Sequence, residues 1–204
     1  MAPYLERVKS FADVPVTDAG VDTVAFLEAS EGVLGLFDLL GSAAFGPVQS
    51  DLKGNIEKVR TRYNATPTQS ATLEQLVINE KGEKKRTATQ GLLWLLRGLS
   101  FTCKALQNAQ AKPETELTVA FTEAYGVTLR QYHSMLVRPI FSLAMKACPY
   151  KKDFYGRLAA DPEGGAAVSD AKFDEELNKW LAALDTIVTR LQSFYLGGGH
   201  DKGF

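Results

Sequence analysis

The sequence predicts an all-α protein. Apolar residues recur at spacings of three and four along most of the 204 residues, and almost no polar/apolar alternation of strand type appears. With 45% hydrophobic and 23% charged residues, the chain has an ordinary globular composition and is long enough to bury a substantial core. Because it contains no internal repeat or low-complexity segment, we expect one domain over residues 1–204. The ends, about 1–18 and 197–204, are expected to be flexible.

Three amphipathic helices are expected in the first part of the chain. The first covers about residues 20–40 and stops at Gly41. The second, about 47–63, begins at a proline, which the first turn of a helix tolerates, and ends before the turn-forming sequence Asn-Ala-Thr-Pro. The third, about 73–81, ends near a glycine.

Four further segments complete the expected series. Residues 84–108 are apolar nearly all round, which predicts the central buried helix. Residues 114–147 have a helical pattern that contains Pro139, so we expect a kink or break near Arg138. A short helix at 152–159 and a loop at 161–165 precede the last helix, 169–195, which three consecutive glycines end.

The second helix carries a row of hydrogen-bonding side chains beside its apolar face. At 100° per residue, Asp51, Asn55, Lys58 and Arg62 line up about a quarter-turn from the apolar stripe. A carboxylate, an amide and an ammonium group could together bind the amide and hydroxyls of one head group. On spacing alone, a solvated face with i,i+3 and i,i+4 pairs is the commoner explanation.

Two residues with ring side chains are further candidates. Trp94, inside a run of leucines, either stacks on the apolar face of a sugar or packs in the core, and core packing is the default for a large aromatic residue. His133 shares an expected helical face with Val137 and Phe141, where it is either a satisfied core histidine or a donor to a ligand carbonyl. A polar row and an indole beside apolar surfaces suit a ligand with a polar head and a long apolar body, so lipid recognition is our hypothesis.

Other classes of protein are disfavoured. The net charge of −1 gives no reason to expect nucleic acid as a partner. No Cys/His pair has the spacing of metal ligands, so we expect no metal and no cofactor. The sequence Gly-x-Ser-x-Gly is absent and a dyad of Asp51 and His133 is only a guess, so we do not expect an enzyme. Because we find no apolar segment of signal-peptide or membrane-spanning type, we expect a cytoplasmic protein.

Four strings, in this order, resemble the glycolipid transfer protein family: DLKGNIEK at 51–58, LWLLRGL at 93–99, Tyr132-His133, and ACPYKKDF at 147–154. The likeness spans about residues 25–157. It implies a two-layer bundle of about eight helices that sandwiches a lipid. It also implies a cytosolic protein, peripheral to membranes, that moves sphingolipids between them without energy input.

The resemblance also implies roles for matching residues. Asp51 would accept from the sphingoid amide, Asn55 and Lys58 would bind sugar hydroxyls, Trp94 would stack on the sugar, and His133 would donate to the acyl carbonyl. We assign the hydrocarbon pocket to Phe37, Leu93, Val137 and Phe141.

The residues at and near Trp94 help to predict whether the head group is a sugar or a phosphate. Relatives that carry ceramide-1-phosphate have arginine at the Trp94 position and another basic residue one turn earlier, where this chain has Gln90, so the resemblance favours sugars over phosphate. Gln90 also departs from the apolar residue of glycolipid carriers, and Met135 stands where some relatives have a membrane-docking tryptophan.

We therefore expect a monomer that binds galactosyl-, glucosyl- or lactosylceramide and touches membranes transiently. Two alternatives stay open. In these, the protein is either a sphingolipid sensor or adaptor whose protein partner recognises the lipid-bound form, or a carrier of a phosphorylated ceramide.

Overall fold

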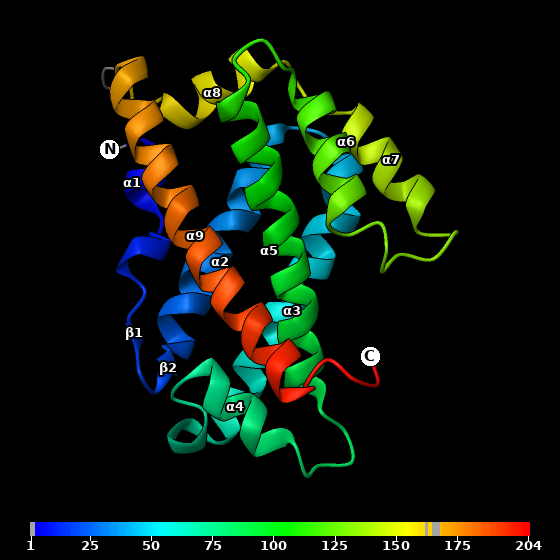
Figure 1. Ribbon diagram of the computed structural model, residues 1–204. Helices are drawn as coiled ribbons and strands as arrows, with labels where there is room; N and C mark the ends of the chain where they lie inside the picture. Colours follow the sequence, from blue (N-terminus) through cyan, green and yellow to red (C-terminus); the bar gives the residue numbers. More distant parts are fainter. Residues whose placement is uncertain (1–2, 162, 165–167) are drawn as a thin grey trace.

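The computed structural model describes residues 3–161, 163–164 and 168–204. Within these ranges it contains nine α-helices: α1 (Tyr4–Arg7), α2 (Thr23–Leu40), α3 (Gly46–Ala65), α4 (Leu73–Glu80), α5 (Thr87–Ala111), α6 (Leu117–Val127), α7 (Arg138–Lys146), α8 (Lys151–Ala159) and α9 (Asp170–Gly198). A two-stranded antiparallel hairpin of β1 (Val16–Thr17) and β2 (Gly20–Val21) precedes α2. The all-α class is confirmed (Figure 1), and the nine helices of the described residues compare with the expected number of about eight. No helix in the described part is both long and apolar enough to span a membrane.

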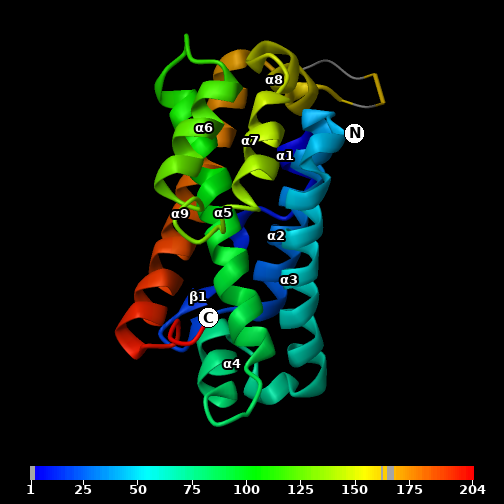
Figure 2. The same ribbon diagram turned by 90° about the vertical axis from the view of Figure 1, so that its right-hand side faces the viewer.

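The central helix of the bundle is α5, as the sequence predicted. It packs against α3, α6 and α9. In Figure 1, α5, α6 and α9 lie in front of α2 and α3, and Figure 2 shows these two layers from the side. The leucines of α5 are buried between its neighbours. The two-layer arrangement is confirmed.

A glycine brings α3 and α5 close together. A Cβ atom on Gly91 of α5 would lie 2.9 Å from Cβ of Lys58 and 3.3 Å from the backbone oxygen of Asn55, both on α3. Contacts below 3.0 Å are not tolerated without movement, so only glycine allows this approach. The polar row of α3 is thereby held beside the N-terminal half of α5.

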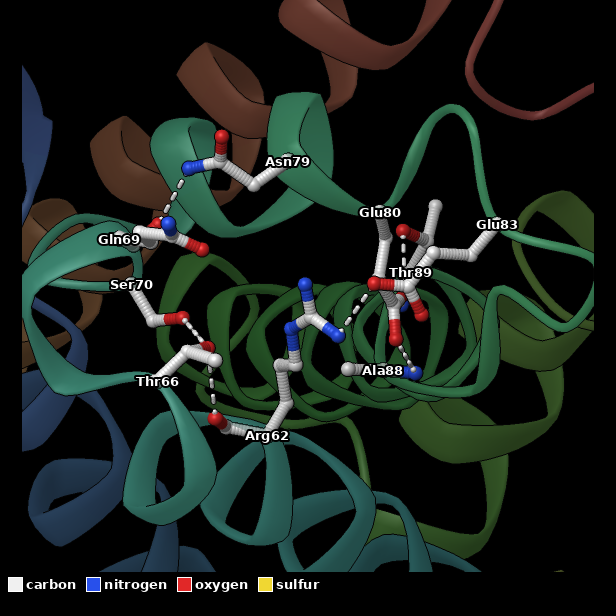
Figure 3. A network of polar contacts seen from close by, with 9 residues as sticks. All are labelled: Arg62, Thr66, Gln69, Ser70, Asn79, Glu80, Glu83, Ala88 and Thr89. Atoms are coloured by element: carbon white, nitrogen blue, oxygen red, sulfur yellow. Dashed lines mark hydrogen bonds and ion pairs between the residues drawn. The ribbon is translucent and has the colours of Figure 1, made fainter.

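The N-terminus of α5 is capped by a side chain from α4. The Glu80 carboxylate accepts from the backbone N–H groups of Ala88 and Thr89 at 3.0 and 2.7 Å, and from the Thr89 hydroxyl at 2.8 Å. Figure 3 shows this contact. The cap fixes the start of α5 at Thr87, three residues after the expected start.

The break inside the segment 114–147 is wider than expected. α6 ends at Val127 and α7 begins at Arg138, and residues 128–137 form turns. The Thr128 hydroxyl donates to the backbone oxygen of Ala124, a bond that satisfies a terminal carbonyl of α6. Pro139 lies in the first turn of α7, where its missing N–H is not needed. The break near Arg138 is confirmed, but the helical face shared by His133 and Phe141 was wrong, because His133 lies in the turns.

The described residues at both ends contact the bundle, and the flexibility that we expected of the two ends stays a prediction. Phe11 is in edge-to-face contact with Trp180 at 5.2 Å between ring centroids. α9 continues to Gly198, Gly199 ends it with φ +62°, and the His200 side chain is buried against Phe194. Periodicity could not reveal these contacts, because they join residues far apart in the sequence. Positions 1–2 of the N-terminal segment and positions 162 and 165 of the expected loop lie outside the described residues.

Candidate functional site

A surface cavity of about 370 Å³ lies between α3, α5 and the chain from the turns into α7. It is lined by all five residues expected to bind a head group, and by two of the four expected to bind hydrocarbon: Asp51, Asn55, Lys58, Trp94 and His133, with Val137 and Phe141. Pro47, Gln90 and Ile140 complete its walls. Residues from three separate segments thus converge on one polar cavity with an apolar side.

Asn55 presents an unused donor at this cavity. Its side-chain oxygen accepts from the Lys58 ammonium at 2.9 Å, whereas its Nδ2 group is buried and has no hydrogen-bond partner. The residue is only 2% exposed. A buried donor without a partner costs about 1–3 kcal/mol. A ligand acceptor in the cavity would remove this cost.

Asp51 supplies an acceptor on the same wall. Burial in the cavity raises the pKa of its carboxyl above the ordinary value, and the Lys58 charge and the neighbouring Asn55 side chain act in the opposite direction. Desolvation disfavours the charged carboxylate, so a donor brought by a ligand would stabilise it.

Arg62 differs from the other three residues of the polar row of α3. This side chain forms an ion pair with Glu83 at 2.7 Å, in the corner between α4 and α5 (Figure 3), and does not line the cavity. Arg62 is therefore paired away from the cavity, whereas Asp51, Asn55 and Lys58 line it, and Lys58 and Asn55 also form an i,i+3 pair.

Trp94 lies at the edge of the leucine-rich core. The neighbouring leucines are buried, but Trp94 is only partly buried and lines the cavity. Its indole lies nearly parallel to the His133 ring, with centroids 6.0 Å apart and planes at 14°. The Arg97 guanidinium lies 4.6 Å from the centre of the indole. The default expectation of core packing does not describe this residue.

His133 is held by contacts from α6 and α7. Its Nδ1 atom lies 3.2 Å from the Tyr125 hydroxyl, and its backbone oxygen accepts from the Arg138 Nε group at 3.0 Å. Burial lowers the pKa of His133, and the charges of Arg138 and Arg97 lower it further, which favours the neutral ring. When Tyr125 donates to Nδ1, the remaining proton is on Nε2, and the ring can then donate to a ligand. Sequence reasoning missed Tyr125, because only the fold brings it next to His133.

The other two residues expected to bind hydrocarbon do not line this cavity. Phe37 is buried in the core against Phe45, with centroids 5.6 Å apart, and Leu93 is buried at the wall of a second cavity. Edge or tilted contacts join five rings through the interior in the order Phe37, Phe45, Phe121, Phe101 and Phe141. The last of these rings lines the first cavity, so the apolar wall of the site continues into the centre of the molecule.

The protein is all-helical in two layers, and its cavity joins polar side chains to an apolar wall, a combination that suits a lipid with a polar head. The family model described as glycolipid transfer protein matches residues 21–160. The chain belongs to the glycolipid transfer protein family.

Two curated relatives resemble most of the chain. It is 48% identical over 186 residues to a glycolipid transfer protein of Aureobasidium melanogenum, over 91% of this chain and 89% of that protein. It is 36% identical over 188 residues to glycolipid transfer protein B of Xenopus laevis, over 87% and 88% of the two chains.

Solved structures agree with this result. The fungal glycolipid transfer protein HET-C2 superposes with a TM-score of 0.87 at 47% identity, covering 95% of this chain and 96% of the other. The structure of FAPP2, described as selecting simple glycosphingolipids, gives a TM-score of 0.87 at 32% identity over 98% of both chains. Mouse ceramide-1-phosphate transfer protein, at 20% identity and a TM-score of 0.83, shares the fold.

Proposed function

We propose that this protein binds a glycosphingolipid and carries it between membranes without chemical change. The observation that supports this most strongly is the convergence of Asp51, Asn55, Lys58, Trp94 and His133 on one cavity. The relatives named as glycolipid transfer proteins support the same function.

The cavity residues suit the polar groups of a glycosylceramide. Asp51 accepts from the sphingoid amide, and Asn55 and Lys58 bind sugar hydroxyls. Trp94 stacks on the sugar ring, and the Nε2–H group of His133 donates to the acyl carbonyl. A lipid lacking one of these groups leaves a buried polar side chain unpaired, and this penalty is the basis of selection.

The charges of the cavity favour a sugar over a phosphate. Among the described residues, Lys58 is the one cation that lines the cavity, and its charge acts on the carboxylate of Asp51. A phosphate group is usually bound by several cationic donors, often arginines. The neutral side chains of Trp94 and Gln90 add none, so a phosphorylated ceramide is the weaker candidate.

Transport follows from the apolar part of the ligand. A ceramide with about thirty methylenes that crossed water alone would expose on the order of 24 kcal/mol of hydrophobic free energy, at ~0.8 kcal/mol per methylene. We propose that its chains enter beside Phe141 and Val137 and separate the rings that lead inward to Phe37. Burial between the helix layers would then remove most of this barrier.

Membrane contact is proposed for the surface around the entrance. Four apolar side chains of the turns and α7 are exposed: Met135, Leu136, Ile140 and Leu143. We call them the 135–143 surface. It adjoins Val137 and His133 of the cavity, so docking there would bring the entrance to the bilayer. We further propose that residues 1–204 act as one domain and as a cytosolic monomer that binds membranes transiently.

A transfer assay tests the function. Labelled galactosyl- or glucosylceramide is followed between vesicles, with wild-type protein and with Asp51→Val and Trp94→Ala. We expect transfer by the wild type and a loss of at least tenfold in each variant.

Asp185→Val and Tyr150→Ala serve as matched controls, because both side chains are exposed and line no part of the cavity. An inactive wild type, or cavity variants as active as the controls, would refute the proposal. Binding with very slow release would instead indicate a sensor.

A further inference from the structure

A second cavity, of about 280 Å³, lies against a neighbouring face of α5. Leu93, Arg97 and Ser100 line it at helical spacing, whereas Gln90 and Trp94 line the first cavity. Its other walls come from the end of α6 and the following turn, from α9, and from the C-terminal tail. Its polar groups include the side chains of Arg97, Ser100, Gln131, Tyr132, Gln192 and Asp201.

Arg97 is a cation without an anionic partner in this cavity. Its guanidinium lies 3.7 Å from the centre of the Tyr132 ring and 4.6 Å from that of Trp94. Within the described residues it forms no ion pair. Burial lowers the pKa of Arg97, while Tyr132 and Asp201 act in the opposite direction. The stacked faces of the guanidinium leave its N–H edge available to an anion.

Asp201 supplies an anion from the C-terminal tail. The Arg86 guanidinium fixes this part of the tail by donating to the backbone oxygens of His200 and Lys202, at 3.4 and 2.7 Å. These two carbonyls flank Asp201, so its backbone is anchored on both sides. Among the described residues, the Asp201 carboxylate has no ion pair. The cavity thus contains one cation and one anion that are not joined to each other.

The rim of the cavity is apolar. Val127 and Leu196 are 67% and 70% exposed, and Tyr132 is 45% exposed. Amphipathic tyrosines and apolar side chains of this kind suit the interface between water and lipid. A ligand attached to hydrocarbon chains could therefore insert its head group while its chains stay in a bilayer.

We propose that the second cavity binds the phosphoethanolamine head group of a membrane phospholipid. The phosphate binds the N–H edge of Arg97, and the primary ammonium donates to Asp201. A choline head group fits less well, because a quaternary ammonium has no N–H donor for the carboxylate. An anionic head group without an ammonium leaves Asp201 facing a like charge. None of the residues that line this cavity lines the first one, so the proposal does not depend on the proposed glycolipid function.

Calorimetric titration with short-chain phosphatidylethanolamine tests the proposal. The matched ligands are short-chain phosphatidylcholine, which lacks the N–H donors, and glycerol phosphate, which lacks the ammonium. We expect saturable binding of the ethanolamine lipid, at least tenfold tighter than either matched ligand.

Single variants test whether the ethanolamine lipid binds in the second cavity. Arg97→Gln should weaken binding of the ethanolamine lipid at least tenfold, and Asp201→Asn should abolish the preference for it over glycerol phosphate. Lys202→Gln, a tail residue that does not line the cavity, and Asp51→Val in the first cavity should bind as the wild type does. Circular dichroism checks the fold of each variant; if Arg97→Gln unfolds, the Asp201→Asn result decides.

Vesicles with and without phosphatidylethanolamine distinguish a membrane lipid from a free head group. The proposal requires tighter binding to vesicles that contain it, lost in Asp201→Asn. Absence of saturable binding by the wild type, or equal binding by Asp201→Asn and wild type for every ligand, would overturn it.

Discussion

At the residue scale, the first cavity contains polar groups that lower the stability of the folded protein as long as no ligand binds them. The Nδ2 group of Asn55 is buried without a partner, and the Asp51 carboxyl has a raised pKa because it is partly buried. Both features reduce stability and both offer a ligand something to bind. Strained or unsatisfied groups of this kind are common where function requires them.

We expect Asp51→Asn to separate stability from binding. The amide has nearly the same shape but no charge to desolvate, so the thermal unfolding midpoint should rise. Lipid affinity should fall by about tenfold, close to the value of one hydrogen bond to a charged group. Calorimetry and a lipid-binding titration measure the two effects, and an unchanged affinity would remove Asp51 from the site.

Gln90 is expected to help distinguish one sugar from another. It lines the first cavity one turn before Trp94, where its amide can bond a hydroxyl. Gln90→Leu should therefore reduce the preference among galactosyl-, glucosyl- and lactosylceramide by up to about tenfold, since one neutral hydrogen bond contributes ~0.5–1.5 kcal/mol. Competition transfer assays measure these preferences. Identical preferences in variant and wild type would show that Gln90 does not take part in sugar recognition.

At the element scale, the turns at 128–137 determine the site. They direct His133 toward Tyr125 and Trp94, and they expose the apolar side chains that follow it. If α6 continued past Val127 as far as the break that we expected near Arg138, His133 would lie on a helix and would be placed differently. Met135 and Leu136, at 83% and 85% exposed, have little contact with the protein and are available to a membrane.

The double variant Met135→Asp/Leu136→Asp should dock weakly. Each apolar side chain lost from the bilayer interface removes about 1.5 kcal/mol, or roughly tenfold in vesicle binding. Vesicle sedimentation measures docking, and a short-chain glycolipid measures the cavity itself, which should keep its affinity. Ile78→Asp, an exposed apolar residue of α4, is the control. Equal vesicle binding by the double variant and the control would place the docking surface elsewhere.

At the scale of the whole molecule, the helices could be predicted and their long-range contacts could not. The pattern of α5 identified the central helix, because a sequence that is apolar nearly all round must be buried. The spacing from Asp51 to Lys58 predicted that these residues share one face of α3, but on spacing alone a solvated face was the commoner explanation. Their role in binding was implied by the family resemblance. The role of Arg62 depends on Glu83, and the Tyr125–His133 contact depends on a turn, so neither follows from periodicity. The same holds for the second cavity, which needs the C-terminal tail.

Both histidines should make stability depend on pH. Burial is the largest cause of the lowered pKa of His133 and of His200. At pH values between these lowered pKa values and 6.5, the unfolded chain binds more protons than the folded one. The free energy of unfolding therefore falls as the pH decreases through this range. The slope should be at most about 1.4 kcal/mol per pH unit for each histidine. Urea unfolding at several pH values measures it, and His133→Gln/His200→Gln should flatten it; an equal slope in this double variant would contradict the assignment.

The central claim is that the first cavity binds the sugar and amide of a glycosphingolipid. A crystal structure of the complex with galactosylceramide tests it most directly. We expect the sugar ring against the Trp94 indole, the sphingoid amide on Asp51, and both chains between the helix layers beyond Phe141. A sugar bound away from Trp94, or hydrocarbon chains lying outside the two layers, would contradict the account.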